Sequence, residues 1–193
     1  MANEDKPVVS AVLTWRGRLL LDIGASRAAS ARLRRCSTTL DVLMERETVE
    51  LIKAVRIAGG RDAGVDERVA IIAVALAHAP ASGPVRFAEA LGRTGEGKSP
   101  GPDERPRFSP ARFATLLRAA EERDWDALIR ALRRAFAILG GTPFNIPAFV
   151  EDLVFLNDRR LRRWTYDYWQ TSAPPDLMLA SGELFPNEAE SLP

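Results

Sequence analysis

The sequence predicts an all-α fold, a two-lobed helical bundle of about eight to nine helices. Apolar residues recur three and four positions apart, which places them on one helical face, as at Phe113, Leu116, Leu117 and Ala120. No stretch alternates apolar and polar residues for long enough to indicate a strand, and no internal repeat of fixed period is present. With 193 residues, 46% of them hydrophobic, the chain is long enough to bury a core.

Residues 1–9 are predicted as an N-terminal tail and residues 10–92 as an N-terminal helical lobe that starts with Ser10 as a helix cap. After a turn at 24–26, helices are expected over 28–36, 40–57, 67–79 and 84–91. Gly59 and Gly60 end one of these helices, and Asp66 is expected to cap the next. The helix over 67–79 has almost no polar face, which predicts a central position in the bundle.

Residues 93–106 are rich in Gly, Pro and charged residues and are predicted as a flexible linker between the lobes. Residues 107–170 are predicted as a C-terminal bundle of helices that start at Ser109-Pro110, near Trp125, at Asn145 and at Asp158. Residues 171–193 are expected to form an acidic tail.

The charge of the chain is balanced in total and uneven along its length. There are 27 Lys and Arg residues against 26 Asp and Glu, and only Lys6, Lys53 and Lys98 among the basic residues are not Arg. All of the basic residues lie at or before Arg163, and the charged residues after Arg163 are all acidic. Arginine is the better residue for forked hydrogen bonding to phosphate. A GC-rich genome would also enrich Arg, so the argument depends on where the arginines lie.

The sequence offers little for catalysis, and we expect no enzyme activity, no cofactor and no metal site. A single histidine, His78, and a single cysteine, Cys36, exclude a zinc site built from His and Cys within the chain. The spacing from Gly92 to Ser99 matches a phosphate-binding loop. However, helical residues precede it and Pro100 follows it, whereas such a loop joins a strand to a helix. The carboxylates lie among arginines and are interpreted as solvated or locally paired charge.

No apolar run is long enough to span a membrane, and the longest, residues 69–77, is interpreted as a buried helix. The first residues hold Glu4 and Asp5 and lack the cationic start and apolar stretch of a signal peptide. We therefore expect a cytoplasmic protein with no membrane partner and no small-molecule substrate.

Arginines gather in three clusters. The first holds Arg27, Arg32, Arg34 and Arg35, the second Arg105, Arg107, Arg112 and Arg118, and the third Arg130, Arg133 and Arg134 with Arg159, Arg160, Arg162 and Arg163. The spacing within the third cluster places Arg130, Arg133 and Arg134 in one helical stripe, and Arg159, Arg162 and Arg163 repeat that geometry on the last helix. Because like charges on one face repel, an anionic partner would offset that repulsion, and nucleic-acid backbone is such a partner. The alternatives are solvated helix faces paired with nearby acids, and a helical adaptor whose arginines meet acidic protein surfaces.

The order of these features resembles one family, the small subunit (CasB) of the type I-E CRISPR surveillance complex, Cascade. The resemblance covers about residues 12–169 and depends on these segments: Trp15, Leu33-Arg34-Arg35, Phe87 to Gly92, Arg107 to Arg118, Leu128 to Arg134, and Phe149 to Tyr168.

This resemblance implies a non-catalytic, two-lobed helical subunit that holds the displaced DNA strand of the R-loop. It also implies the partners, which are the backbone and large subunits of Cascade, a second copy of the chain, guide RNA and single-stranded DNA. Carried over by residue, it indicates Arg34, Arg35, Arg107, Arg112, Arg118, Arg134, Arg159 and Arg160 as contacts. The clusters add Arg27, Arg130, Arg133 and Arg163 to the candidate nucleic-acid-binding residues.

Overall fold

The computed structural model describes residues 5–21, 23–60, 64–94, 104–172 and residue 174, and in this part of the chain the all-α prediction is confirmed. The described residues contain no strand, and Ser82 and Phe144 form an isolated bridge. The helices are α1 (Asp5–Leu19), α2 (Gly24–Arg35), α3 (Thr39–Leu43), α4 (Arg46–Ile57), α5 (Val65–His78), α6 (Phe87–Gly92), α7 (Pro110–Glu121), α8 (Trp125–Leu139), α9 (Ile146–Val154) and α10 (Asp158–Trp169).

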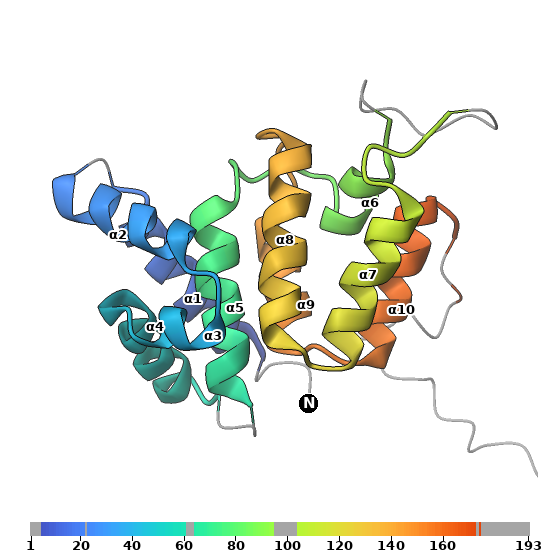
Figure 1. Ribbon diagram of the computed structural model, residues 1–193. Coiled ribbons are helices and arrows are strands. Elements are labelled where there is room, and N and C mark those ends of the chain that lie inside the picture. The colour runs from blue at the N-terminus through green and yellow to red at the C-terminus, as the bar shows by residue number, and fades with distance from the viewer. Residues whose placement is uncertain (1–4, 22, 61–63, 95–103, 173, 175–193) are drawn as a thin grey trace, which may run out of the picture.

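Helix α5 lies at the centre of the molecule, as its apolar sequence predicts. Every residue from Val69 to Ala77 is buried. On one side α5 packs against α2, α3 and α4, and on the other against α8 and α9 (Figure 1). Helices α1 to α5 thus form one half of the structure and α6 to α10 the other, joined through one continuous apolar core.

Several helix ends differ from the sequence prediction. Helix α1 begins at Asp5, so Ser10 lies inside it and is not a cap, because Val8 is buried in the core and extends the helix toward the N-terminus. Residues 1–4 of the predicted tail lie outside the described residues. The helix expected over 40–57 is two helices, α3 and α4, because the backbone of Glu45 is extended between them.

The caps of the later helices agree better with the prediction. Asn145 caps α9 as predicted, since its side chain accepts a hydrogen bond from the amide of Ala148 at 2.9 Å. Asp158 lies in the first turn of α10, whose cap is the preceding Asn157. Asp66 likewise lies in the first turn of α5 behind Gly64, which adopts a left-handed conformation.

The short helix α6, assigned above to the N-terminal lobe, packs most extensively against α10 of the other half. At Gly92 the backbone of α6 comes so close to that of Tyr168 that a Cβ atom would overlap the Tyr168 carbonyl oxygen. Nearby, the amide of Arg107 donates to the carbonyl of Arg93 at 2.8 Å and that of Phe108 to Leu91 at 3.1 Å. The two ends of the predicted linker are therefore neighbours, and residues 95–103 between them lie outside the described residues.

Aromatic side chains fill the core between α6 and the C-terminal helices. Phe87 lies at the centre of this cluster, with its ring centroid 4.7 Å from that of Phe149 and 5.4 Å from that of Trp164.

Among the helices of the described residues, none has the length and apolar character needed to cross a membrane. The predicted acidic tail is described only at residues 171, 172 and 174.

Candidate nucleic-acid interface

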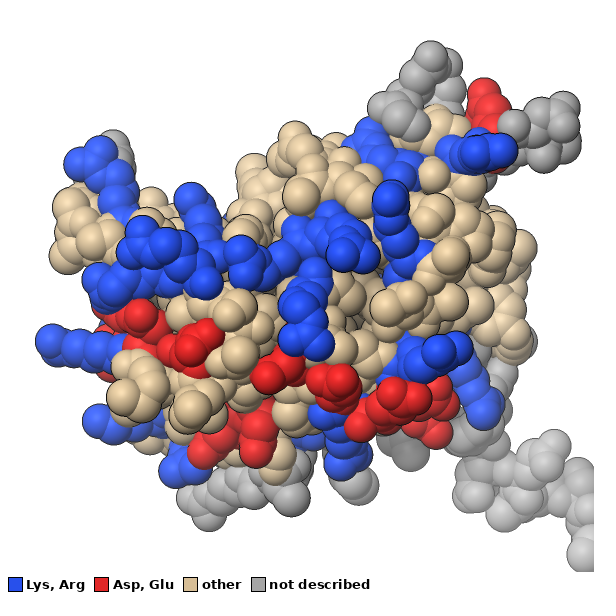
Figure 2. Space-filling model, in the orientation of Figure 1, with Lys and Arg blue, Asp and Glu red and all other residues tan. Residues whose placement is uncertain are grey.

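Basic side chains form a band across the face made by α2, α8 and the first turn of α7, with a row of acidic side chains below it (Figure 2). We use the name basic band for the exposed and half-buried arginines that these elements carry there, which are Arg34 and Arg35 of α2, Arg130, Arg133 and Arg134 of α8, and Arg112 of α7. The structure thus brings together members of all three predicted clusters. The three α8 arginines share one stripe, as their spacing predicts.

Two arginines of the band are held by backbone carbonyls at the ends of neighbouring helices. The Nε of Arg34 donates to the carbonyl of Ala77 in the last turn of α5 at 2.6 Å. The Nη1 of Arg133 donates to the carbonyl of Cys36, which caps α2, at 3.2 Å. Carbonyls at a helix C-terminus have no partner within the helix and carry partial negative charge, so they favour a cation.

Other arginines of the band extend into solvent. Arg35, Arg112 and Arg134 are exposed, and within the described part of the chain none of these three side chains forms a hydrogen bond or an ion pair. Arg130 is exposed one turn before Arg134 and contributes to lowering the pKa of Asp126. The band therefore presents cationic groups that the fold itself does not neutralise.

The acidic side chains near the band are largely engaged in other contacts. Glu45 and Glu47 bind the same guanidinium, that of Arg32, at 2.8 and 2.9 Å, and the hydrogen bond that Arg32 donates to Glu45 is the main cause that raises the pKa of Arg32. Asp126 accepts hydrogen bonds from the amide and the hydroxyl of Thr39 at 2.7 and 2.8 Å. These bonds lower the pKa of Asp126, so it stays ionised and joins α8 to the start of α3.

The histidine of the chain lies beside the band. His78 ends α5, and its ring stacks on that of Phe136 with centroids 6.2 Å apart. Burial lowers the pKa of His78, and the positive charges of Arg133 and Arg34 lower it further. The imidazole is therefore neutral near pH 7, and its pKa responds to the charges of both guanidiniums. No sequence signal linked His78 to the arginine clusters.

The structure divides the third predicted cluster, because α7 lies between α8 and α10 (Figure 1). On α10, Arg160 is bound by Asp152 and Glu151, each at 2.9 Å, and its side chain is only 12% exposed. Arg163 is half-buried, and burial is the first cause that lowers its pKa, followed by the charge of Arg86. Arg159 is exposed on the first turn of α10. These residues lie outside the basic band.

Asp152 is the centre of a buried polar network that sequence reasoning did not identify. Its carboxylate accepts from Arg160 at 2.9 Å, from Arg86 at 2.8 Å and from the indole of Trp164 at 2.8 Å. Arg86 also binds Asp167 at 2.7 Å. Spacing along the chain could not reveal this network, because Arg86 stands far from the α10 arginines in sequence. Arg160 therefore holds α10 to α9 through its ion pairs with Asp152 and Glu151.

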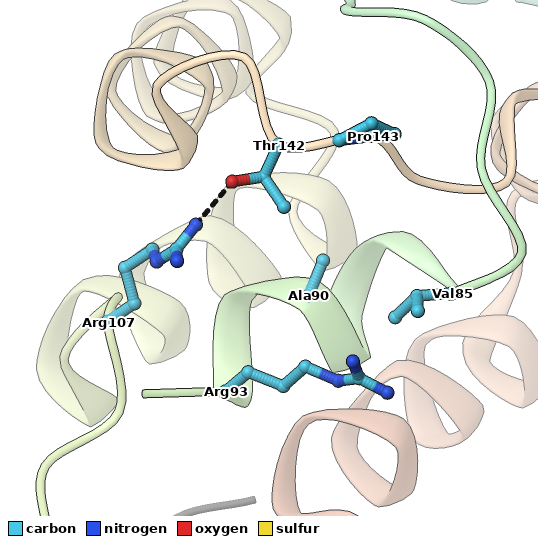
Figure 3. Close-up of a pocket in the computed structure, with 6 residues that line it drawn as sticks. All are labelled: Val85, Ala90, Arg93, Arg107, Thr142 and Pro143. Carbon is cyan, nitrogen blue, oxygen red and sulfur yellow. Dashed lines mark hydrogen bonds between the residues drawn. The ribbon is translucent and has the colours of Figure 1, made fainter. Parts of the chain in front are cut away.

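The remaining candidates lie at other positions. Arg107 donates to the hydroxyl of Thr142 and lines a pocket with Val85, Ala90, Arg93 and Pro143, where the Arg93 side chain points away from that of Arg107 (Figure 3).

Two further candidates are exposed. Arg118 lies on α7 about 120° around the helix from Arg112, at about 100° per residue. Arg27 lies at the start of α2. No group of three or more His, Cys, Asp or Glu side chains in the described residues is placed to hold a metal ion.

Comparison with known families finds a match. The model of the family described as CRISPR-associated protein Cse2 matches residues 29–169, more than half of the chain. The matched region runs from the middle of α2 to the end of α10 and contains every arginine of the basic band. No curated protein and no solved structure matches the chain.

Proposed function

Because the chain belongs to the Cse2 family, whose members are subunits of the Cascade complex of CRISPR defence, we propose that it is a non-catalytic small subunit that binds nucleic-acid backbone. The ligand is the displaced DNA strand of the R-loop or the guide RNA, bound without choice of sequence. The proposed protein partners are the backbone and large subunits of Cascade and a second copy of the chain, in the cytoplasm.

The observation that carries this proposal is the basic band. Its arginines come from three helices and form one surface in which Arg35, Arg112 and Arg134 have no partner among the described residues. Cations displayed in this way bind phosphates and release counterions, which favours binding to any sequence. Contacts to phosphate position a strand without reading its bases, so this surface supports backbone binding.

A fluorescence anisotropy titration with labelled oligothymidylate over a range of salt concentrations tests the proposal. The slope of log affinity against log salt concentration is about −0.7 for each phosphate neutralised on a single strand. Loss of two contacts in Arg112→Glu/Arg134→Glu should therefore make the slope shallower by about 1.4 and weaken binding at every salt concentration. The double variant Arg46→Glu/Lys53→Glu on α4 is the control, because it makes the same change in net charge on exposed side chains away from the band.

Binding that does not depend on salt concentration, or equal losses of affinity in the two double variants, would contradict backbone binding by the band.

A second candidate function is a helical adaptor whose arginines meet acidic protein surfaces. It is favoured by exposed apolar side chains on α3, on α4 and on the C-cap residue of α3, with Leu40, Met44 and Ile57 exposed to 69%, 79% and 88%. In that case Arg112→Glu/Arg134→Glu would abolish assembly with Cascade proteins and leave oligonucleotide affinity unchanged.

A further inference from the structure

Arg34 and Arg133 come from different helices, and both side chains lie near the end of α5. Arg34 is bound to the carbonyl of Ala77, the residue before His78. Arg133 is bound to the carbonyl of Cys36, two residues after Arg34. The positive charges of both side chains also act on His78. We call this place, where α2, α5 and α8 meet, the Arg34–Arg133 seam.

Each guanidinium at the seam is fixed and still has donors to offer. An arginine carries five N–H donors in a rigid fork. The Ala77 carbonyl takes the one on the Nε of Arg34, and the described residues provide no acceptor for the four on its Nη atoms. Arg133 contacts Cys36 through its Nη1. A side chain that the fold already holds loses less conformational entropy when it binds a ligand than a free one does.

We propose that the Arg34–Arg133 seam is the primary phosphate-binding subsite of the basic band. One phosphodiester group binds between the two guanidiniums through the N–H groups that the carbonyls leave open. Arg35 and Arg134, which flank the seam on the same two helices, act as mobile point charges that attract the strand. This assignment rests on the proposed function, because it names the phosphate-contacting part of the same surface.

Charge-conserving substitutions separate the two roles. Lysine keeps the positive charge of arginine but lacks its planar fork. In Arg34→Lys/Arg133→Lys the affinity for oligothymidylate should fall about ten-fold while the salt slope is unchanged. The matched control Arg35→Lys/Arg134→Lys alters the adjacent residue on each helix, and its affinity should change by less than about two-fold. Equal losses in the two double variants would overturn the subsite.

His78 provides a second readout, because the chain has one histidine and therefore one imidazole Hε1 signal in an NMR spectrum. Two cations face His78, Arg34 from α2 and Arg133 from α8, while Phe136 covers its ring. A phosphodiester bound between these cations offsets their charge, so saturation with oligonucleotide should raise the pKa of His78. The rise should be smaller in Arg34→Lys/Arg133→Lys and unchanged in Arg35→Lys/Arg134→Lys. Because the signal also reports folding, it identifies any variant that fails to fold.

Oligothymidylate and oligouridylate serve as parallel probes, since DNA and RNA present the same phosphodiester. Equal effects on His78 identify the backbone as the ligand, and a rise with one probe only identifies which strand occupies the seam. Tight binding of either probe without any change in the pKa of His78 would overturn the subsite and leave the proposed function intact. If neither probe binds the wild-type chain, the proposed function and the subsite both fail.

Discussion

Replacing the buried carboxylate of Asp152 should be among the most damaging single changes in the fold. Asp152→Asn keeps the shape of the side chain and removes the charge that binds Arg160, Arg86 and Trp164 at 2.8–2.9 Å. The Asp152 side chain is 4% exposed, so solvent cannot replace the lost contacts. Removing one partner from a buried ion pair costs about 3–5 kcal/mol of folding free energy.

Each of the two arginines bound to Asp152 has another carboxylate partner, which places the expected loss of folding free energy at the lower end of that range. Arg86 keeps Asp167 at 2.7 Å and Arg160 keeps Glu151 at 2.9 Å, so neither guanidinium is left without a counter-ion. We therefore expect Asp152→Asn to lower the free energy of unfolding by about 3 kcal/mol. For a domain of this size that loss lowers the melting temperature by about 6–12 °C.

Urea unfolding followed by circular dichroism and by tryptophan fluorescence measures this loss, with Glu151→Gln as the matched control. Glu151 is the adjacent residue and pairs with the same Arg160, but its side chain is 39% exposed. An exposed pair contributes about 1 kcal/mol or less. A loss in Asp152→Asn no larger than that in Glu151→Gln would refute the argument that burial of the network determines its contribution.

Three further changes test other parts of the structure. Gly92→Ala should lower the melting temperature, because its Cβ meets the backbone of Tyr168 and costs about 1–3 kcal/mol, whereas Gly17→Ala enters open space and should not. Tyr168→Phe leaves the buried carbonyl of Phe108 without its donor and should cost about 1–3 kcal/mol in urea unfolding. Burial raises the pKa of Tyr168 to about 12, so wild-type stability that is complete below the ordinary pKa of 10.0 should be lost as the pH rises between these values, and the Phe variant should lack this loss. Burial lowers the pKa of His78, so the unfolded chain binds the proton more readily; stability should fall as the pH drops through 6.5, and His78→Gln should flatten that dependence in chemical unfolding.

The sequence predicted the helices well where local signals and packing agree. Proline after Ser109 and the apolar spacing around Phe113 located α7, and the uniform apolar character of 69–77 located the central helix. The prediction that Ser10 caps the first helix was wrong. Val8 is buried in the core, so the helix begins before Ser10 and leaves it no capping role. A helix over 84–91 was predicted, but its packing against α10 could not be, since that contact depends on residues that are distant in the chain.

The candidate interface was predictable as a composition and a set of stripes, and less so residue by residue. Arg34 and Arg35 are adjacent, yet one is fixed to a carbonyl and the other has no partner among the described residues. Arg130 and Arg160 both belong to the third predicted cluster, but Asp152 binds only the second of them. Spacing along one helix determines which arginines share a face, whereas the acceptors come from other elements.

The two backbone hydrogen bonds that join residues 91 and 93 to 108 and 107 have a consequence for evolution and for engineering. Where a chain leaves and re-enters a fold at neighbouring points, each doubling of the intervening length costs about 0.6 kcal/mol in loop closure. Insertions between residues 95 and 103 should therefore be tolerated while the contact of α6 with α10 is kept. A fluorescent protein grafted at this point would label the subunit within a large assembly without altering its arginine-bearing face.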